Sequence, residues 1–96
     1  ITPHIEEYNK SVFAQYTVLV KNRNSLLKLF AKAKIPVVCY YTTPFHKLEI
    51  FNKKFSSLKV SEDITTQVLS LPMSPYLTER EVNKVVDIFK EIVDGR

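Results

Sequence analysis

The sequence has few of the residues that build the commonest reactive sites. It contains one glycine, Gly95, one cysteine, two histidines and no tryptophan. A phosphate-binding P-loop or a dinucleotide-binding turn needs several glycines, because backbone amides must approach the phosphate closely, so both are excluded. One cysteine cannot form an intrachain disulfide, and His4 and His46 lack the spacing of a zinc site, so we expect no bound metal.

A nucleophile is equally hard to find. Cys39 lies in an apolar run, where we expect it to pack as a small hydrophobic residue rather than to act as a thiolate. None of the serines has the context of a nucleophile elbow. The adjacent acids Glu62 and Asp63 have the positions of helix-cap residues. We therefore expect no catalytic residue in this chain.

Positive charge is concentrated in the middle of the sequence. The net charge is +4, and residues 10–59 hold ten lysines and arginines against one acid. Such a block could face nucleic acid, so a basic nucleic-acid-binding α+β module is one alternative function. However, Lys28 and Lys32 fall on the polar side of a predicted helix, and Arg23 is the only arginine of the block. A solvated surface is therefore the favoured interpretation.

No targeting or membrane-spanning segment is recognisable. No apolar run approaches the roughly 18 residues of a membrane span, and the first residues lack the pattern of a signal peptide. A lone cysteine suits a reducing compartment, so we expect a cytoplasmic protein without a membrane partner. The chain begins with Ile1 rather than methionine, which suggests a piece of a longer protein, although processing or a tag would give the same start.

Apolar patterning predicts one α+β domain, residues 1–96, with the order β-α-β-α-α-β-α. The predicted fold is a small, three-stranded, mainly antiparallel sheet covered on one face by helices. Strands are predicted at 11–20, 37–41 and 68–72, and helices at 25–33, within 46–55, at 61–67 and from 78 to about 95.

Local signals set several helix ends. Thr78 followed by Glu81 three positions later is a capping box, which makes the last helix the most secure element. Ser61 has the position of an N-cap for the helix predicted at 61–67. Pro36 forces the first helix to stop earlier. Lys34 then occupies the place where a left-handed glycine is usual.

The stretch IPVVCYYTTPFHK, residues 35–47, joins a buried strand to an unusual polar end. Tyr40 and Tyr41 point to opposite faces of a strand, so one should join the core while the other reaches a surface or cleft. His46 follows Pro44, beyond the end of that strand. A ring nitrogen there can bind an anionic or hydroxylated ligand, while a solvated loop histidine is the alternative interpretation.

Three runs, taken in order, resemble the C-terminal part of the DegT/DnrJ/EryC1/StrS sugar aminotransferases, which are pyridoxal-phosphate enzymes. The runs are SVFAQYTVLV, IPVVCYYTTPFHK and VLSLPMSPYLTEREVNKVV. The family's G-I-P-T-x-V-H-Y-P-x-P-L-H pattern maps onto residues 34–46 without a gap, and the LPM-P-YLT run at 71–78 is a second match.

The resemblance assigns roles residue by residue. Five positions carry the family's letters, and Phe45 replaces its leucine: the five are Ile35, Pro36, Tyr41, Pro44 and His46. Three of the departures from the pattern matter: Lys34 stands for the glycine, Tyr40 for the first histidine and Thr42 for the first proline. In the family this segment shapes the nucleotide-sugar pocket, so Tyr40, Tyr41 and His46 are the implied substrate-binding residues. The departures at Tyr40 and Thr42 leave open whether the family's substrate specificity carries over to this chain.

The resemblance also implies a division of labour within a larger enzyme. This chain would be the C-terminal small domain of an aspartate aminotransferase-like, fold type I enzyme, supplying one wall of the substrate cleft. The lysine and acid that hold pyridoxal 5'-phosphate would lie in a preceding large domain, so this fragment alone should be inactive and bind no cofactor.

The intact enzyme would transfer an amino group from a donor such as glutamate to a nucleotide-linked keto-sugar, for surface polysaccharide synthesis, as a homodimer. The AQYT and LPM-P-YL runs are most similar to the branch acting on UDP-linked 3-keto hexuronic acids. A degenerate, non-catalytic domain is the remaining alternative.

Overall fold

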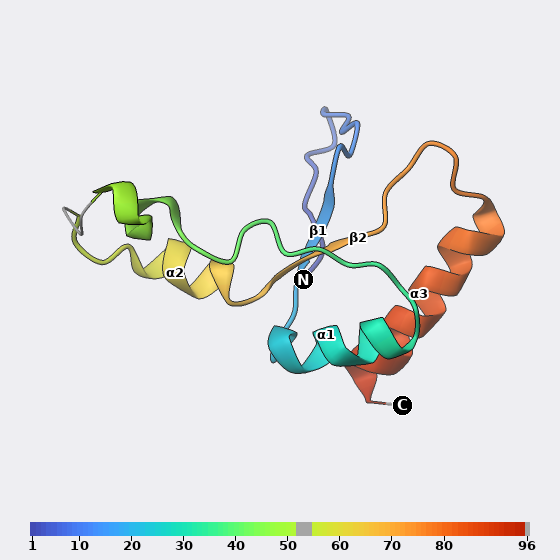
Figure 1. Ribbon diagram of the computed structural model, residues 1–96. Coiled ribbons are helices and arrows are strands. Elements are labelled where there is room, and N and C mark those ends of the chain that lie inside the picture. Colours follow the sequence, from blue (N-terminus) through green and yellow to red (C-terminus); the bar gives the residue numbers. More distant parts are fainter. Residues whose placement is uncertain (52–54, 96) are drawn as a thin grey trace.

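The computed structural model describes residues 1–51 and 55–95 and has an α+β architecture (Figure 1). The elements in chain order are β1 (Tyr16–Leu19), α1 (Arg23–Lys32), the 3-10 turns η1 (Phe45–Lys47) and η2 (Glu49–Phe51), α2 (Lys59–Thr65), β2 (Val68–Leu71) and α3 (Glu79–Asp94). The predicted α+β class is thus confirmed, and five of the seven predicted elements are present as β1, α1, α2, β2 and α3. No helix within these described ranges is both long and apolar enough to cross a membrane.

The sheet has two antiparallel strands, with Tyr16 opposite Leu71 and Leu19 opposite Val68. The first strand is shorter than predicted because Phe13 adopts a left-handed φ of 45°, which interrupts extended backbone before residue 16. The sheet therefore begins only where the chain resumes a regular β conformation.

The predicted third strand, at 37–41, is reduced to an isolated bridge, so the three-stranded sheet is not confirmed. Val38 exchanges both backbone hydrogen bonds with Ser70, at 3.1 and 2.7 Å. Pro36 has no N–H to donate to a ladder, and the chain turns away after residue 39. One paired residue is therefore all that remains of this strand.

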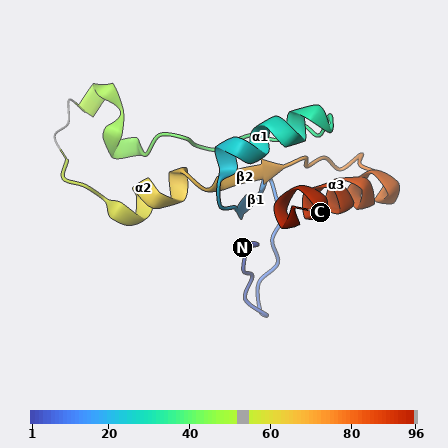
Figure 2. The ribbon, with the colours of Figure 1, turned by 90° about the horizontal axis from the view of Figure 1, so that it is seen from below.

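The core lies between the sheet and two helices. α1 and α3 lie beside each other on one side of the strands (Figures 1 and 2), and the ring of Phe30 stacks on that of Phe89 with centroids 5.9 Å apart. Six apolar side chains are buried among the described residues: Val18, Val20, Phe30, Ile35, Val68 and Leu69. This small core fixes β2, which in turn holds Val38.

The ends of α1 and α3 follow the sequence signals. Lys34 is left-handed at φ 58°, as predicted, and Ile35 N–H bonds to Phe30 C=O at 3.0 Å in a Schellman-type C-cap. α3 begins with the predicted capping box, in which Thr78 and Glu81 exchange hydrogen bonds. It ends at Gly95, whose φ of 70° suits a residue without a side chain.

The segment between Pro44 and Thr66 differs more from the prediction. The expected helix within 46–55 is two separate 3-10 turns over its described part, and residues 52–54 lie outside the described residues. α2 starts at Lys59 rather than at the predicted cap Ser61, because the Glu62 carboxylate reaches back to the N–H of Leu58. Its described parts, η1, η2 and α2, form an arm that projects away from α1 and α3 (Figures 1 and 2).

Candidate functional site

The predicted substrate-binding residues begin where the chain leaves the sheet. Beyond Val38 the two tyrosines are both exposed, Tyr40 by 38% and Tyr41 by 70%, and their ring centroids are 5.3 Å apart. The expectation that one of them joins the core is wrong. Strand alternation no longer applies, because regular pairing ends at Val38.

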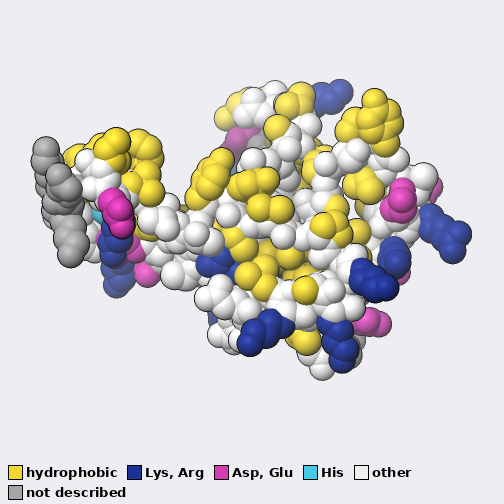
Figure 3. Space-filling model, viewed as in Figure 1, with side chains coloured by type: hydrophobic (Ala, Val, Ile, Leu, Met, Phe, Trp, Pro, Cys, Tyr) yellow, Lys and Arg dark blue, Asp and Glu magenta, His cyan; other side chains and the backbone are white. Residues whose placement is uncertain are grey.

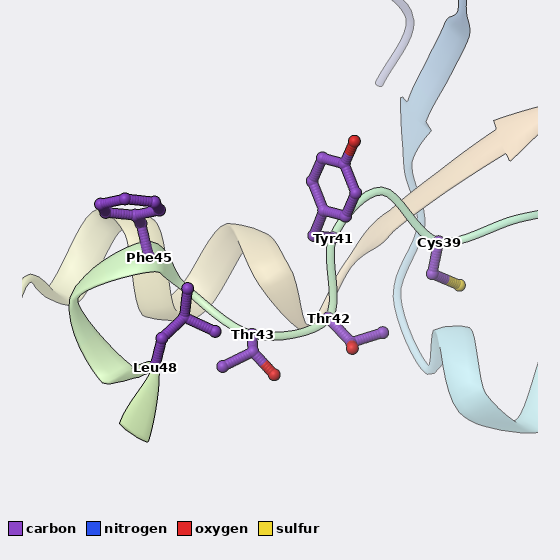
Figure 4. Close-up of a pocket in the computed structure, with 6 residues that line it drawn as sticks. All are labelled: Cys39, Tyr41, Thr42, Thr43, Phe45 and Leu48. Atoms are coloured by element: carbon purple, nitrogen blue, oxygen red, sulfur yellow. The ribbon is translucent and has the colours of Figure 1, made fainter. Parts of the chain in front are cut away.

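Tyr41 lies at one end of an open hollow of about 470 Å³, which we call the Tyr41 hollow. In Figure 4, Cys39 and Tyr41 stand at one end, Phe45 and Leu48 at the other, and two threonines lie between. The lining residues are Cys39, Tyr41, Thr42, Thr43, Phe45 and Leu48. The lining therefore combines hydroxyl groups with apolar side chains, as ligand sites commonly do.

Tyr40 lines a different hollow of about 420 Å³, which we call the Tyr40 hollow. Residues from all three resembling runs meet there: Gln15 from the first, Val38 and Tyr40 from the second, Met73 and Leu77 from the third. The pairing of β1 with β2 and the Val38 bridge bring these distant segments together. Motifs that are separate in sequence thus form one surface.

His46 occupies a third place, inside the arm. Its ring is only 8% exposed, so the alternative of a solvated loop histidine is wrong. Nε2–H donates to Oε1 of Glu62 at 2.9 Å, and Nζ of Lys47 lies 3.0 Å from Oε2 of the same carboxylate. The structure therefore places Tyr40, Tyr41 and His46 near one another along the chain, but it does not bring them into one hollow.

The Glu62 carboxylate is strongly stabilised in its ionised form. The hydrogen bond from His46, followed by the contact with Lys47, lowers the pKa of Glu62 from 4.5 to about 2. The N–H of Leu58 and the hydroxyl of Ser57 add to this effect, both at 3.1 Å, while partial burial opposes it. At neutral pH the Glu62 carboxylate is therefore ionised, and it accepts hydrogen bonds from these partners.

Two charged residues bond to partners far along the chain, and the sequence did not predict these contacts. Glu62 has the pattern of a first-turn acid, and nothing in its neighbourhood indicates His46, 16 positions away. Arg23 is 5% exposed and donates from Nη2 to the carbonyl of Thr65 at 2.9 Å, while Nε and Nη1 have no protein partner among the described residues. One signal in the sequence points to Arg23: it is the one arginine in a lysine-rich block. Arginine is preferred over lysine where a buried cation makes several hydrogen bonds.

The described residues do not fit pyridoxal phosphate. A lysine that binds this cofactor covalently needs a desolvated pocket, and each described lysine is exposed. The described ranges also contain no group of three histidine, cysteine or acidic side chains arranged for a metal.

Comparison with known families decides the assignment of the chain. The model of the DegT/DnrJ/EryC1/StrS aminotransferase family matches residues 1–90. The chain belongs to this family. The resemblance carried by the three runs is thereby confirmed.

Individual relatives agree with this assignment. The UDP-2-acetamido-2-deoxy-3-oxo-D-glucuronate aminotransferase of Pseudomonas aeruginosa is 42% identical over 76 residues, covering 79% of this chain and 21% of that protein. A DegT DnrJ EryC1 StrS aminotransferase of Brucella abortus superposes with a TM-score of 0.86 at 33% identity, covering 96% and 26% of the two chains.

S. venezuelae DesV, solved with a ketimine intermediate, superposes with a TM-score of 0.87 at 23% identity. The match covers 97% of this chain and 26% of DesV, and it shows the shared fold. The chain thus spans about a fifth to a quarter of the length of these relatives.

Proposed function

We propose that this chain is the C-terminal small domain of an aminotransferase that acts on a nucleotide-linked keto-sugar. The observation that carries this proposal is the meeting of all three family-like runs at the Tyr40 hollow, beside the strand end that bears Tyr41. Family membership over residues 1–90 supports the class of reaction. The small domain supplies one wall of the substrate cleft.

The proposed substrate is a UDP-linked 3-oxo hexuronic acid. The P. aeruginosa relative is named for such a sugar nucleotide, and it is 42% identical to this chain. Tyr40, Tyr41 and His46 are the proposed substrate-side residues. The two exposed tyrosines would contact the sugar nucleotide, and His46, bonded to Glu62, would shape the site from behind. The Tyr41 hydroxyl, on a side chain that is 70% exposed, is the group freest to meet a sugar hydroxyl.

The remaining parts of the reaction belong to the rest of the polypeptide. Pyridoxal phosphate, when bound there, supplies the electron sink that amino-group transfer requires. An amino donor such as glutamate, a homodimeric assembly, a cytoplasmic location and a role in surface polysaccharide synthesis complete the proposal. The residues of this chain bind and orient the sugar.

The direct test uses the intact polypeptide that contains this chain. Purified protein is incubated with glutamate and a UDP-linked 3-oxo-glucuronate, and the aminated sugar nucleotide is measured by mass spectrometry. We expect product that depends on both substrates. Absence of product with every keto-sugar nucleotide tried would favour a degenerate, non-catalytic domain.

A further inference from the structure

One carboxylate joins η1 to the start of α2. The side chain of Glu62 receives His46 Nε2–H at 2.9 Å and lies 3.0 Å from Lys47 Nζ, both on η1. It also receives the Ser57 hydroxyl and the Leu58 N–H, both at 3.1 Å, at the start of α2. Four donors from two segments therefore converge on one anion, which we call the Glu62 clamp.

The clamp leaves Glu62 little capacity to bind a ligand. Three donors converge on Oε1, and Lys47 Nζ lies on Oε2. Since a carboxylate oxygen has about two acceptor positions, Oε1 is filled and only Oε2 keeps one open. His46 is likewise committed, because its Nε2–H points to Glu62 and its ring is 8% exposed. The groups of the clamp thus act on their neighbours in the chain.

The clamped turn is also a wall of the Tyr41 hollow. Phe45 and Leu48, on either side of His46 and Lys47, form the end of that hollow opposite Tyr41 (Figure 4). Phe45 is 74% exposed while the adjacent His46 is 8% exposed, so one face of the turn meets the hollow and the other is held by the clamp. Whatever fixes η1 fixes the width of the hollow.

We propose that Glu62 is a positioning residue for sugar binding: by holding η1 through His46 and Lys47, it sets the distance between the Phe45–Leu48 wall and Tyr41. This inference rests on the proposed function, and it assigns the Tyr41 hollow to the sugar portion of the nucleotide sugar. Charge-assisted hydrogen bonds are stronger and shorter than neutral ones, so an ionised clamp holds the wall more tightly than a neutral one. Glu62 acts without touching the substrate.

The experiment compares Glu62→Ala, Glu62→Gln and wild type in the intact polypeptide. For Glu62→Ala we expect the KM for the UDP-linked 3-oxo-glucuronate to rise by about 10-fold or more, since a misplacement of about 1 Å can cost up to roughly 100-fold. The kcat and the KM for glutamate should stay close to wild type. Glu62→Gln keeps the shape and one acceptor oxygen, and it should give an intermediate KM.

Glu81→Ala is the matched control. Glu81 is also a carboxylate that receives hydrogen bonds from a helix N-terminus, at Thr78, but it lies on α3 and does not line the Tyr41 hollow. We expect its loss to leave the KM for the sugar nucleotide unchanged.

The outcomes separate the two proposals. If the wild type is active and Glu62→Ala has an unchanged KM for the sugar nucleotide, Glu62 is not a positioning residue, while the proposed function stands. An equal rise in Glu81→Ala, or an equal rise in the KM for glutamate, also overturns the positioning role of Glu62, because both indicate general destabilisation. Inactive wild type overturns the proposed function, and the clamp's role falls with it.

Discussion

At the scale of single residues, the ionisation of Glu62 links pH to the stability of the arm. Its pKa is about 2 in the folded chain against 4.5 for an unperturbed glutamate, chiefly because of His46 and then Lys47. The folded state therefore releases this proton more readily than the unfolded state. The stabilisation is fully present above pH 4.5 and is lost as pH falls towards 2.

We predict that Glu62→Gln removes part of this acid sensitivity. Urea unfolding of wild type and variant at pH 6, 4.5 and 3 should show the two converging as the pH falls, since wild type alone loses the ionised clamp. Some sensitivity should remain in the variant, because the pKa of Glu81 is also lowered by its hydrogen bonds with Thr78. Parallel curves across this range would contradict the assignment of the effect to Glu62.

Residues differ in how far the sequence predicts their role. The pairing of Thr78 with Glu81 is predictable, since both lie within one helical turn and the geometry is local. The bonds from His46 to Glu62 and from Arg23 to Thr65 span 16 and 42 positions. Such contacts depend on how whole elements pack, so neither their existence nor the burial of Arg23 follows from local pattern.

At the scale of elements, α3 is the helix whose start depends most clearly on one side chain. Thr78 Oγ1 accepts the N–H of Glu81 at 3.3 Å, and Glu81 Oε2 accepts the N–H of Thr78 at 2.8 Å. We predict that Thr78→Ala lowers the free energy of unfolding by about 1 kcal/mol, as for other N-caps. Urea unfolding with Thr2→Ala as an exposed control checks this; equal midpoints for both variants would contradict it.

Elements also differ in how far the sequence predicts them. α3 and β2 follow from strong periodicity and from clear ends. The strand predicted at 37–41 has equally apolar residues, yet only Val38 pairs, because Pro36 cannot donate to a ladder and the chain turns after residue 39. The sequence predicts Tyr40 and Tyr41 within this strand and His46 beyond it. The structure places the three in different surroundings, because the path of the chain after Val38 does not follow from local pattern.

At the scale of the whole molecule, the chain is extended for its length. Its radius of gyration is 15.5 Å, against about 12–13 Å for a compact domain of this size. Apolar side chains cover much of the outer surface in the view of Figure 3. Phe45, Ile50 and Val60 of the arm are 74%, 81% and 72% exposed. A chain that corresponds to about a quarter of its relatives' length thus buries only part of its apolar surface.

The whole fold consequently depends on a few side chains, of which Leu69 is fully buried at the centre of β2. We predict that Leu69→Ala lowers the free energy of unfolding by about 2–5 kcal/mol, from lost burial and the cavity left behind. Small domains have only about 5–15 kcal/mol in total, so the urea midpoint should fall by a large fraction. Val12→Ala, at a side chain 92% exposed, should leave the midpoint within error. If both variants unfolded at the wild-type midpoint, β2 would not be the centre of a cooperative core, and the Val38 bridge that it holds could not fix the position of Tyr40 and Tyr41.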